Sequence, residues 1–215
     1  MAYKVYISPS SQTENTYASG KTNEAVQCRR IAVALEDALI RCGIEAKANI
    51  DDGVTMYDRV RESNEWGADL HVPIHTNAFN TLLRGTRMFC FDLKGKGYQA
   101  SRAILDELAP VVPGESDGIK SAEFYEIVHS KAPCAYVEAA FHDNVEQASW
   151  IISHIDAIAE AICKGICKYQ KSKYVPPDTT IYRVQVGAFR NRDNAESMLN
   201  KLEKAGFDGF ITKGV

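Results

Sequence analysis

Hydrophobic and polar positions follow two different periods along this chain. Residues 3–8 alternate in the manner of a strand, whereas residues 23–42 repeat apolar side chains at helical spacing. The other predicted strands are 44–49, 68–75, 85–91 and 135–138, and the other predicted helices are 57–66, 99–108 and one or two within 144–169. Strands that alternate with helices in this way predict an α/β fold, with a largely parallel central sheet flanked by helices.

Three polar residues fall where such a fold places its ligands, which is at the carboxyl ends of the strands. His75 and Glu138 each end a predicted strand, and Glu24 lies at the start of the helix predicted for 23–42. The pattern therefore predicts one shared site that contains all three.

The alternation breaks at residues 171–180, KSKYVPPDTT, where two consecutive prolines amid polar residues indicate a stiff linker. Beyond it, residues 181–188 and 207–212 are predicted strands and 192–205 a helix. This βαβ unit is too small to fold well alone. The expected organisation is a domain over 1–172, a linker over 173–180 and a small unit over 181–215.

Composition narrows the class of protein. The 215 residues are 45% hydrophobic and 25% charged, with a net charge of −3. No nucleic-acid partner is expected, because such proteins usually concentrate basic residues on one face. No membrane span is expected either, since no apolar run approaches about 18 residues. The N-terminus, MAYKVYISPSS, lacks the apolar run of a secretory signal, so we expect synthesis in the cytoplasm without a signal peptide.

The six cysteines do not form a CxxC pair. They are Cys28, Cys42, Cys90, Cys134, Cys163 and Cys167. The last two are four residues apart on a helical pattern, a spacing that suits a metal. The favoured interpretation is nevertheless that the cysteines are small apolar residues in a reducing compartment.

A hydrolytic zinc site needs about three nitrogen or oxygen ligands, an open position for water and a nearby base. On its own, His75 is more often a hydrogen-bonded structural histidine, and the helix dipole favours Glu24 at a helix start. Glu138 is more informative, because it follows the apolar run Cys-Ala-Tyr-Val and precedes Ala-Ala-Phe. A carboxylate in such surroundings needs a partner or a function, and burial raises its pKa toward the range that suits proton transfer.

Three blocks of the chain resemble the amidase-3 family of N-acetylmuramoyl-L-alanine amidases. GADLHVPIHTNA at 67–78 is similar to the family's ADLFISIHAN block, and APCAYVEAAFHDN at 132–144 resembles its PAVLVExGFxxN block. Thr22-Asn23-Glu24 resembles the segment that supplies the family's glutamate ligand, and Gly85-Thr86 the start of its GxExY strand. The resemblance spans residues 3–169, in the family's order and spacing.

The resemblance implies a zinc enzyme that hydrolyses the amide between N-acetylmuramic acid and L-alanine in bacterial peptidoglycan. Glu24 and His75 would be metal ligands. Glu138 would activate the water held by zinc and then pass its proton to the leaving amine, while zinc polarises the carbonyl. Asn77 and Asn144 would shape the substrate pocket, with loop capping as an equally favoured role.

The chain departs from the family at the first ligand. The family begins with DPGHGG, whose histidine binds zinc, whereas this chain has Ser8-Pro9-Ser10-Ser11-Gln12. Ser11 takes the position of the histidine. Either the neighbouring Gln12 coordinates the metal through its carbonyl oxygen, or water fills the position, or two protein ligands hold zinc loosely. We take Gln12 as the candidate ligand.

The other histidines are weaker candidates. His71 is on the same predicted strand as His75 and lies about 13 Å from it, too far to share the metal. His142, just beyond Glu138, is close enough in sequence to approach the site. His129 and His154 are expected to be surface or structural residues.

The tail resembles the opening of a SPOR domain. The resemblance rests on YRVQVGAF at 182–189, followed by Asn194-Ala195-Glu196 and Gly206-Phe207. That family binds glycan strands stripped of stem peptides, which an amidase produces. The module normally has about twice this length, with two similar halves. A half module leaves an exposed sheet edge, so either the tail is truncated or a homodimer forms through it.

The sequence thus predicts a cell-wall lytic amidase with Zn²⁺ as cofactor and peptidoglycan as partner. It would act on the wall after release, either as a phage or prophage endolysin or as an autolysin of a spore former, in the mother cell or in germination. The alternative is a catalytically impaired amidase-like domain that serves as a cell-wall binding module. The missing histidine motivates that alternative, whereas the presence of Glu24 and Glu138 favours the enzyme. The HExxH signature of zinc peptidases is absent.

Overall fold

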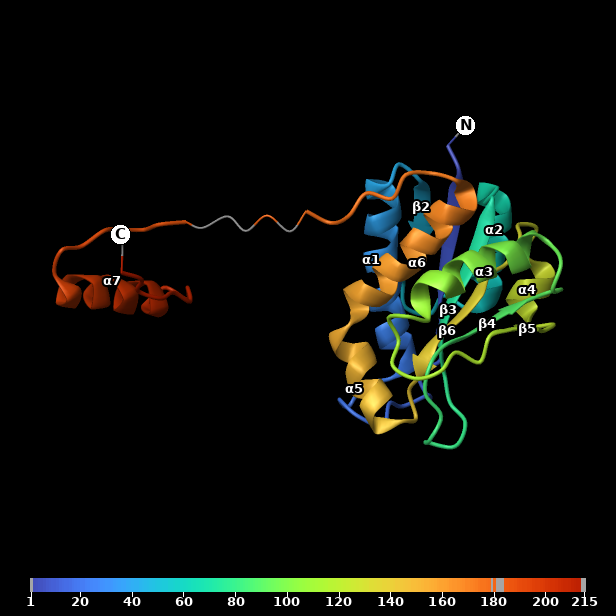
Figure 1. Ribbon diagram of the computed structural model, residues 1–215, viewed down its shortest axis with the longest axis horizontal. Helices are drawn as coiled ribbons and strands as arrows, with labels where there is room; N and C mark the ends of the chain where they lie inside the picture. The colour runs from blue at the N-terminus through green and yellow to red at the C-terminus, as the bar shows by residue number, and fades with distance from the viewer. Residues whose placement is uncertain (1, 179, 181–183, 214–215) are drawn as a thin grey trace. The chain divides into compact units, whose positions relative to one another are not determined.

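The computed structural model describes residues 2–178, 180 and 184–213. It divides into two compact units, Met1–Pro177 and Asp178–Val215. The first unit is built on a six-stranded sheet with the order β2-β1-β3-β6-β4-β5 (Figure 1). Neighbouring strands are parallel except for β4 and β6, which are antiparallel. The predicted α/β fold with a largely parallel sheet is confirmed.

The strands and helices alternate through most of the first unit. The strands are β1 (Lys4–Pro9), β2 (Glu45–Ala48), β3 (Leu70–Asn77), β4 (Arg87–Cys90), β5 (Ile119–Ser121) and β6 (Tyr136–Phe141). The helices are α1 (Glu24–Arg41), α2 (Met56–Trp66), α3 (Lys96–Leu108), α4 (Tyr125–His129), α5 (Val145–Ser153) and α6 (Ile155–Gln170). The second unit contains α7 (Arg192–Lys204).

Local sequence signals fix the ends of the first helices. Asn23 caps α1, and its side chain accepts a hydrogen bond from the Val26 amide at 3.0 Å. Thr55 and Asp58 form a reciprocal capping box at the start of α2. This helix ends at Gly67, which has φ 71°, a left-handed conformation that glycine adopts without steric cost. These caps place Glu24 in the first turn of α1.

Each central strand presents alternate residues to two different layers. Val5 and Ile7 of β1 pack into the main hydrophobic core with residues of α1, α3 and α6. Tyr6, between them, faces α2, where its ring meets Trp66 edge-on at 6.4 Å. One layer of helices is packed closely: a side chain at Gly165 of α6 would lie 2.3 Å from the Cα of Ile104 in α3. Helices therefore flank the sheet, as Figure 1 shows.

The predicted elements of the first unit are found, with ends that differ by a few residues. The sequence missed two short ones, the three-residue β5 and the five-residue α4. Neither is long enough to show a hydrophobic period. The prediction of one or two helices in 144–169 resolves into α5 and α6, which meet at His154.

The second unit differs from its prediction. The helix expected over 192–205 is present as α7. The strands expected over 181–188 and 207–212 are not seen in residues 184–188 and 207–212, and residues 181–183 lie outside the described part. Val184 and Phe210 are 88% and 77% exposed, so these segments lack the packing and pairing that a strand needs. The sheet edge on which the predicted homodimer depended is likewise not seen in residues 184–213.

Candidate active site

Strand alternation brings the candidate residues to one face of the sheet. On β3, Leu70, Val72 and Ile74 belong to the main core. His71 and His75 therefore point to the opposite face, as successive side chains of a strand do. The parallel register of β3 and β6 pairs His75 with Glu138. The two residues that the sequence placed at strand ends are thus neighbours across the sheet.

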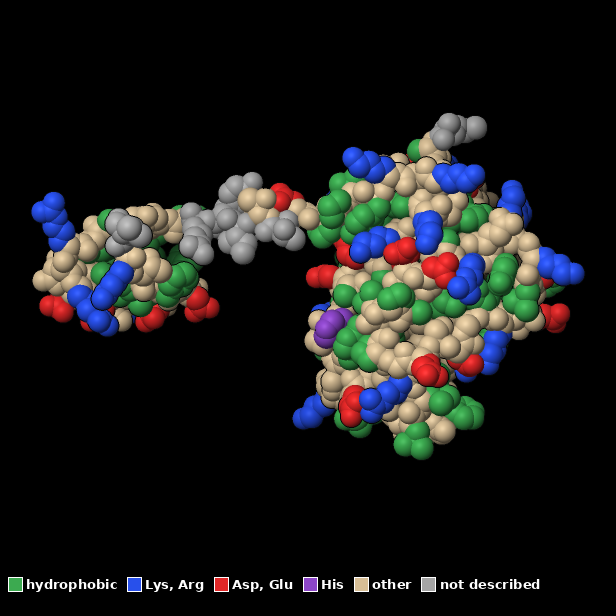
Figure 2. Space-filling model, viewed as in Figure 1, with side chains coloured by type: hydrophobic (Ala, Val, Ile, Leu, Met, Phe, Trp, Pro, Cys, Tyr) green, Lys and Arg blue, Asp and Glu red, His purple; other side chains and the backbone are tan. Residues whose placement is uncertain are grey.

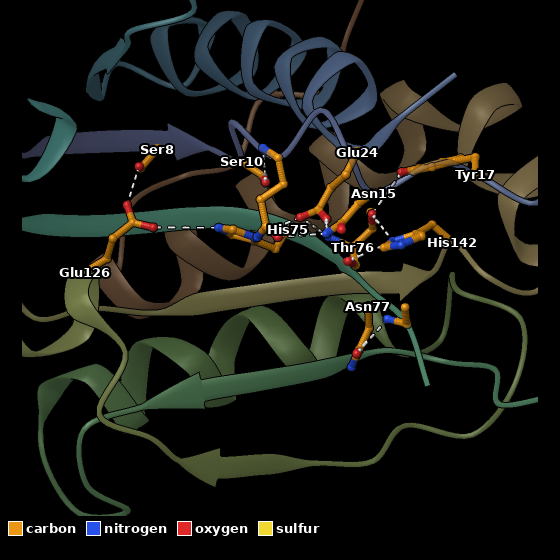
Figure 3. A network of polar contacts seen from close by, with 12 residues as sticks. Ser8, Ser10, Asn15, Tyr17, Glu24, His75, Thr76, Asn77, Glu126 and His142 are labelled. Atoms are coloured by element: carbon orange, nitrogen blue, oxygen red, sulfur yellow. Dashed lines mark hydrogen bonds and ion pairs between the residues drawn. The ribbon is translucent and has the colours of Figure 1, made fainter. Parts of the chain in front are cut away.

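Glu24 reaches this site from the first turn of α1. His75 Nδ1 lies 2.8 Å from Glu24 Oε1, and both side chains are almost fully buried (Figure 3). Asn15 Nδ2 donates to Glu24 Oε2 at 2.6 Å and to Gln12 Oε1 at 2.8 Å. One amide group therefore joins Glu24 to the loop that follows β1.

Gln12 lies at the site, with its amide nitrogen 3.4 Å from His75 Nδ1. Its carbonyl oxygen instead accepts the hydrogen bond from Asn15, so coordination through Oε1 requires the amide to turn over. Zn–N and Zn–O bonds of 2.0–2.2 Å place tetrahedral ligand atoms about 3.4 Å apart. The Gln12–His75 separation matches this spacing, and the Glu24–His75 separation is shorter because the two groups are hydrogen-bonded. Ser11, at the position of the family histidine, is exposed.

Glu138 is half-buried, and its environment favours the protonated form. Its Oε2 atom is buried without a hydrogen-bond partner among the described residues. Burial, with a further contribution from the Glu24 carboxylate, raises the pKa of Glu138 to about 7, against the opposing effects of His75 and Arg87. A carboxyl group that exchanges its proton near neutral pH is suited to act as a general base.

Glu126 is a site residue that the sequence analysis missed. It lies in α4, and its carboxylate contacts Ser8 Oγ and His71 Nε2, the latter at 3.2 Å. Its other oxygen lies 3.7 Å from His75 Nε2, a charge contact longer than a hydrogen bond. Glu126 therefore contacts the rings of both His71 and His75, and Figure 3 shows its contact with His75.

Glu24, His75 and Glu126 stabilise one another's charged forms. Burial opposes ionisation of Glu126, but its contacts with the imidazoles of His71 and His75 lower its pKa to about 2. Burial likewise opposes protonation of His75, but the carboxylates of Glu126 and Glu24 raise the pKa of its imidazole to about 10. His71 is anchored at its other nitrogen by Ser63 Oγ at 3.0 Å. The result is a continuous buried polar row from Ser63 to Glu24.

Asn77 and Asn144, the two predicted substrate residues, differ in their hydrogen bonds. Asn144 is the N-cap of α5: its Oδ1 accepts from the amides of Glu146 and Gln147 at 3.1 Å, and its Nδ2 donates to Thr81 at 2.9 Å. This favours the capping role that the sequence left open. Asn77 ends β3, and its buried Nδ2 lacks a hydrogen-bond partner in the described part of the chain. Asn77 therefore keeps an unpaired donor at the end of β3.

The other histidines have structural contacts. His142 Nδ1 lies 2.9 Å from both Oγ1 and the carbonyl oxygen of Thr76, and its ring stacks on Tyr17 at 5.3 Å. It braces the residue next to His75 without joining the Glu24–His75 pair. His129 and His154 are exposed and contact backbone carbonyls of their own helices.

Other surface features lie away from this site. A hollow of about 810 Å³ between α1 and the α5–α6 junction is lined by residues such as Arg30 and Ile155, and it contains none of the candidate residues. The candidate carboxylates and the imidazole converge beside β3 and β6, away from this hollow, so their chemistry defines the candidate site. Acidic and basic side chains are interspersed over the face of the first unit in Figure 2. None of the described helices is long and apolar enough to cross a membrane.

Two family models match the chain. Residues 5–168 match the family described as N-acetylmuramoyl-L-alanine amidase (Amidase_3), and residues 164–214 match the SPOR domain. The second match confirms the resemblance of the tail and begins within α6, before the linker.

Curated relatives match along almost the whole chain. N-acetylmuramoyl-L-alanine amidase CwlM of Bacillus licheniformis is 28% identical over 219 residues, which cover 97% of this chain and 84% of that protein. The sporulation-specific N-acetylmuramoyl-L-alanine amidase of Bacillus subtilis is 27% identical over 220 residues, with the same coverage.

Solved structures share the fold at low identity. The catalytic domain of the amidase CwlV from Bacillus (Paenibacillus) polymyxa aligns with a TM-score of 0.72 and 19% identity, over 80% of this chain and 99% of that one. An N-acetylmuramoyl-L-alanine amidase from Clostridium difficile gives a TM-score of 0.70 and 24% identity, over 80% and 98%. Together with the family model, which covers most of the sequence, these matches show that the chain belongs to the Amidase_3 family of N-acetylmuramoyl-L-alanine amidases.

Proposed function

We propose that the first unit hydrolyses the amide bond between N-acetylmuramic acid and L-alanine of peptidoglycan in a zinc-dependent reaction. The observation that carries this proposal is the β3–β6 register, which sets His75 beside Glu138 while Glu24 contacts the His75 ring. An imidazole, a carboxylate ligand and a separate carboxylate base are the groups that such a hydrolysis needs. The family and the names of the relatives support the substrate.

The donor set fits zinc. Glu24 Oε1 and His75 Nδ1 are a carboxylate oxygen and an imidazole nitrogen that already face each other, and both are common zinc ligands. The Gln12 amide is the third group, at a separation from His75 that suits a shared ion. It is a neutral and weaker donor than the histidine of the family pattern, so we expect weaker zinc binding than three strong ligands would give.

The chain's own residues would then perform the proton transfers. Bound zinc would supply polarisation of the scissile carbonyl and a lowered pKa of a nearby water. Glu138 takes a proton from the attacking water and returns it to the leaving amine. Its pKa near 7 allows both steps, because the group gains and loses a proton close to neutral pH.

Positioning falls to the surrounding side chains. Asn77 Nδ2 is the free donor that we assign to a polar group of the substrate. The ring of Tyr136 stacks on His75 at 4.6 Å and limits its rotation. Glu126 adds a negative charge on the far side of the same imidazole, an arrangement that orients a metal-binding histidine.

Removal of zinc tests this proposal. Purified peptidoglycan treated with the intact protein should release stem peptides with a free L-alanine amine. A chelator should abolish the release, and added Zn²⁺ should restore it. His75→Ala should lose the zinc of this site and lower the rate by more than about 100-fold, since even residues that only support a ligand are worth 10–100-fold. His154→Ala, outside the site, is the matched control and should behave as wild type.

The same experiment distinguishes the amidase from the alternative, a catalytically impaired domain that only binds the cell wall. If the protein sediments with peptidoglycan but releases no stem peptides at any zinc concentration, the first unit is a wall-binding module and the proposed amidase activity is wrong. Release that survives complete removal of the metal would overturn the zinc dependence but keep the amidase.

We also propose that the second unit holds glycan strands from which stem peptides have been removed, as the SPOR match suggests. A chain that ends at Pro177 should keep its fold, because the first unit has its own hydrophobic core. It should cleave small soluble peptidoglycan fragments at the wild-type rate but no longer sediment with denuded glycan. Equal sedimentation of the two chains would show that the glycan is held elsewhere.

A further inference from the structure

Three cysteine thiols from two helices that are distant in sequence converge at one end of the first unit. Cys163 and Cys167 lie one turn apart on α6, and Cys42 is the C-cap of α1. Cys42 Sγ is 3.7 Å from Cys163 Sγ, and the three sulfur atoms all lie within 4.8 Å of one another. We call this group the thiol cluster.

The spacing of the sulfur atoms suits a metal ion. With Zn–S bonds of 2.3 Å, tetrahedral coordination separates neighbouring sulfur atoms by about 3.8 Å. The Cys42–Cys163 separation matches this value, and the remaining separations exceed it by at most about 1 Å. A disulfide requires an S–S bond of about 2.05 Å, so Cys42 and Cys163 are free thiols in this arrangement.

The surroundings hold the cluster and supply a fourth group. The segment after α6 folds back over the thiols: the Val175 amide donates to Cys42 Sγ at 3.3 Å, and the Val175 carbonyl accepts from Arg41 Nε at 3.0 Å. Ser172 Oγ is buried without a hydrogen-bond partner among the described residues, although its amide bonds to the Cys167 carbonyl at 2.9 Å. This hydroxyl is therefore available to act as the fourth ligand of a metal ion.

Access is provided by Cys42, which is half-buried, whereas Cys163 and Cys167 are fully buried. We propose that the thiol cluster binds one thiophilic divalent cation of the zinc class, with the three sulfur atoms as thiolates and Ser172 Oγ or water as the fourth ligand. Binding releases the thiol protons to solvent. The ion would tie α1, α6 and the start of the linker together.

This site is separate from the catalytic one. Glu24 begins α1 and Cys42 follows its last residue, so the two sites lie at opposite ends of a helix about 27 Å long. Their ligands also differ in kind, because the candidate active site offers only nitrogen and oxygen atoms. The proposal therefore does not depend on the proposed amidase activity.

Cobalt tests the thiol cluster by its own spectrum. The intact, reduced, metal-free protein is titrated with Co²⁺ under anaerobic conditions, and sulfur-to-cobalt charge transfer is followed in the near ultraviolet. The wild type should develop this absorption with one equivalent of ion per chain, and Cys42→Ser should lose most of it. Cys90→Ser is the matched control, since Cys90 is a buried thiol of β4 outside the cluster, and it should keep the band.

Several outcomes would overturn the proposal. They are a wild type without thiolate absorption, a band that Cys42→Ser leaves unchanged, and a mass that shows a Cys42–Cys163 disulfide in protein isolated without reductant. If Cys42→Ser does not fold, the wild type alone decides the matter. Cd²⁺ should then strongly slow alkylation of the half-buried Cys42, and an unchanged alkylation rate would refute the site.

Discussion

Glu138→Gln should lower the rate of amide hydrolysis by about 10²–10⁴-fold while the protein keeps its fold and its zinc. Glutamine has the same shape but cannot accept the proton of water, and neither Glu24 nor His75 contacts Glu138 through a hydrogen bond in the structure. The measurement is the release of stem peptides at equal zinc occupancy. Glu107→Gln, on the surface of α3, is the control and should keep full activity.

The pH dependence checks the same assignment. The pKa of Glu138 is raised from 4.5 to about 7, so the base is ionised only above that range. Wild-type kcat/KM should therefore fall as the pH falls through about 7. In metal-free protein this raised pKa lowers stability progressively between about pH 4.5 and about 7, and the loss is complete above that range. At pH 8 Glu138→Gln should therefore unfold less readily than wild type, by about 1–3 kcal/mol. A variant with full activity would refute Glu138 as the base.

Glu126→Ala should lower the free energy of unfolding by about 3–5 kcal/mol, because it leaves His71 and Ser8 buried without their partner. It should also weaken zinc binding by about 10–100-fold, because the imidazole of His75 loses the charge on its far side. Urea denaturation measures the first effect and competition with a chelator the second.

A double variant separates these two roles. In His71→Phe/Glu126→Leu the buried hydrogen-bonded pair is replaced by apolar groups, and the new ring can stack on Tyr6 as His71 does at 5.6 Å. Such replacements are often neutral, so stability should return toward that of wild type. Zinc affinity should stay low, because His75 still lacks Glu126. Wild-type zinc affinity in the double variant would show that Glu126 serves the fold alone.

The fold of the first unit was predictable because each long element carries its own signal. β3 alternates and α1 repeats its apolar residues every three or four positions, with Asn23 and Gly43 at its ends. The second unit shows the limit of such patterns. VQVGAF has the composition of a strand, but a strand exists only with a partner, and in the described residues 184–189 none pairs with it.

The site was predictable where residues lie in neighbouring strands and not where it depends on other tertiary contacts. His75 and Glu138 lie inside β3 and β6, short of the strand ends at which the sequence placed them, but the parallel pairing of the two strands still brings them together. Glu126 lies in a helix of five residues, 55 positions from His71, and nothing in its neighbourhood indicates a histidine partner. The distance between His71 and His75 also gives no indication of their connection, because Glu126 lies between them and contacts both rings. The thiol cluster was missed for the same reason, since Cys42 is 121 positions from Cys163.

The exposed turn at Ser11 and Gln12 has a consequence for how such an enzyme diversifies. Substitutions at exposed positions usually change stability by less than about 0.5 kcal/mol, whereas changes at the buried Glu24 or His75 disturb a packed polar row. Under the proposed zinc mechanism, a substitution at Gln12 would therefore change the affinity for the metal at little cost to folding. The dependence of activity on the zinc supply could then change while the scaffold stays the same.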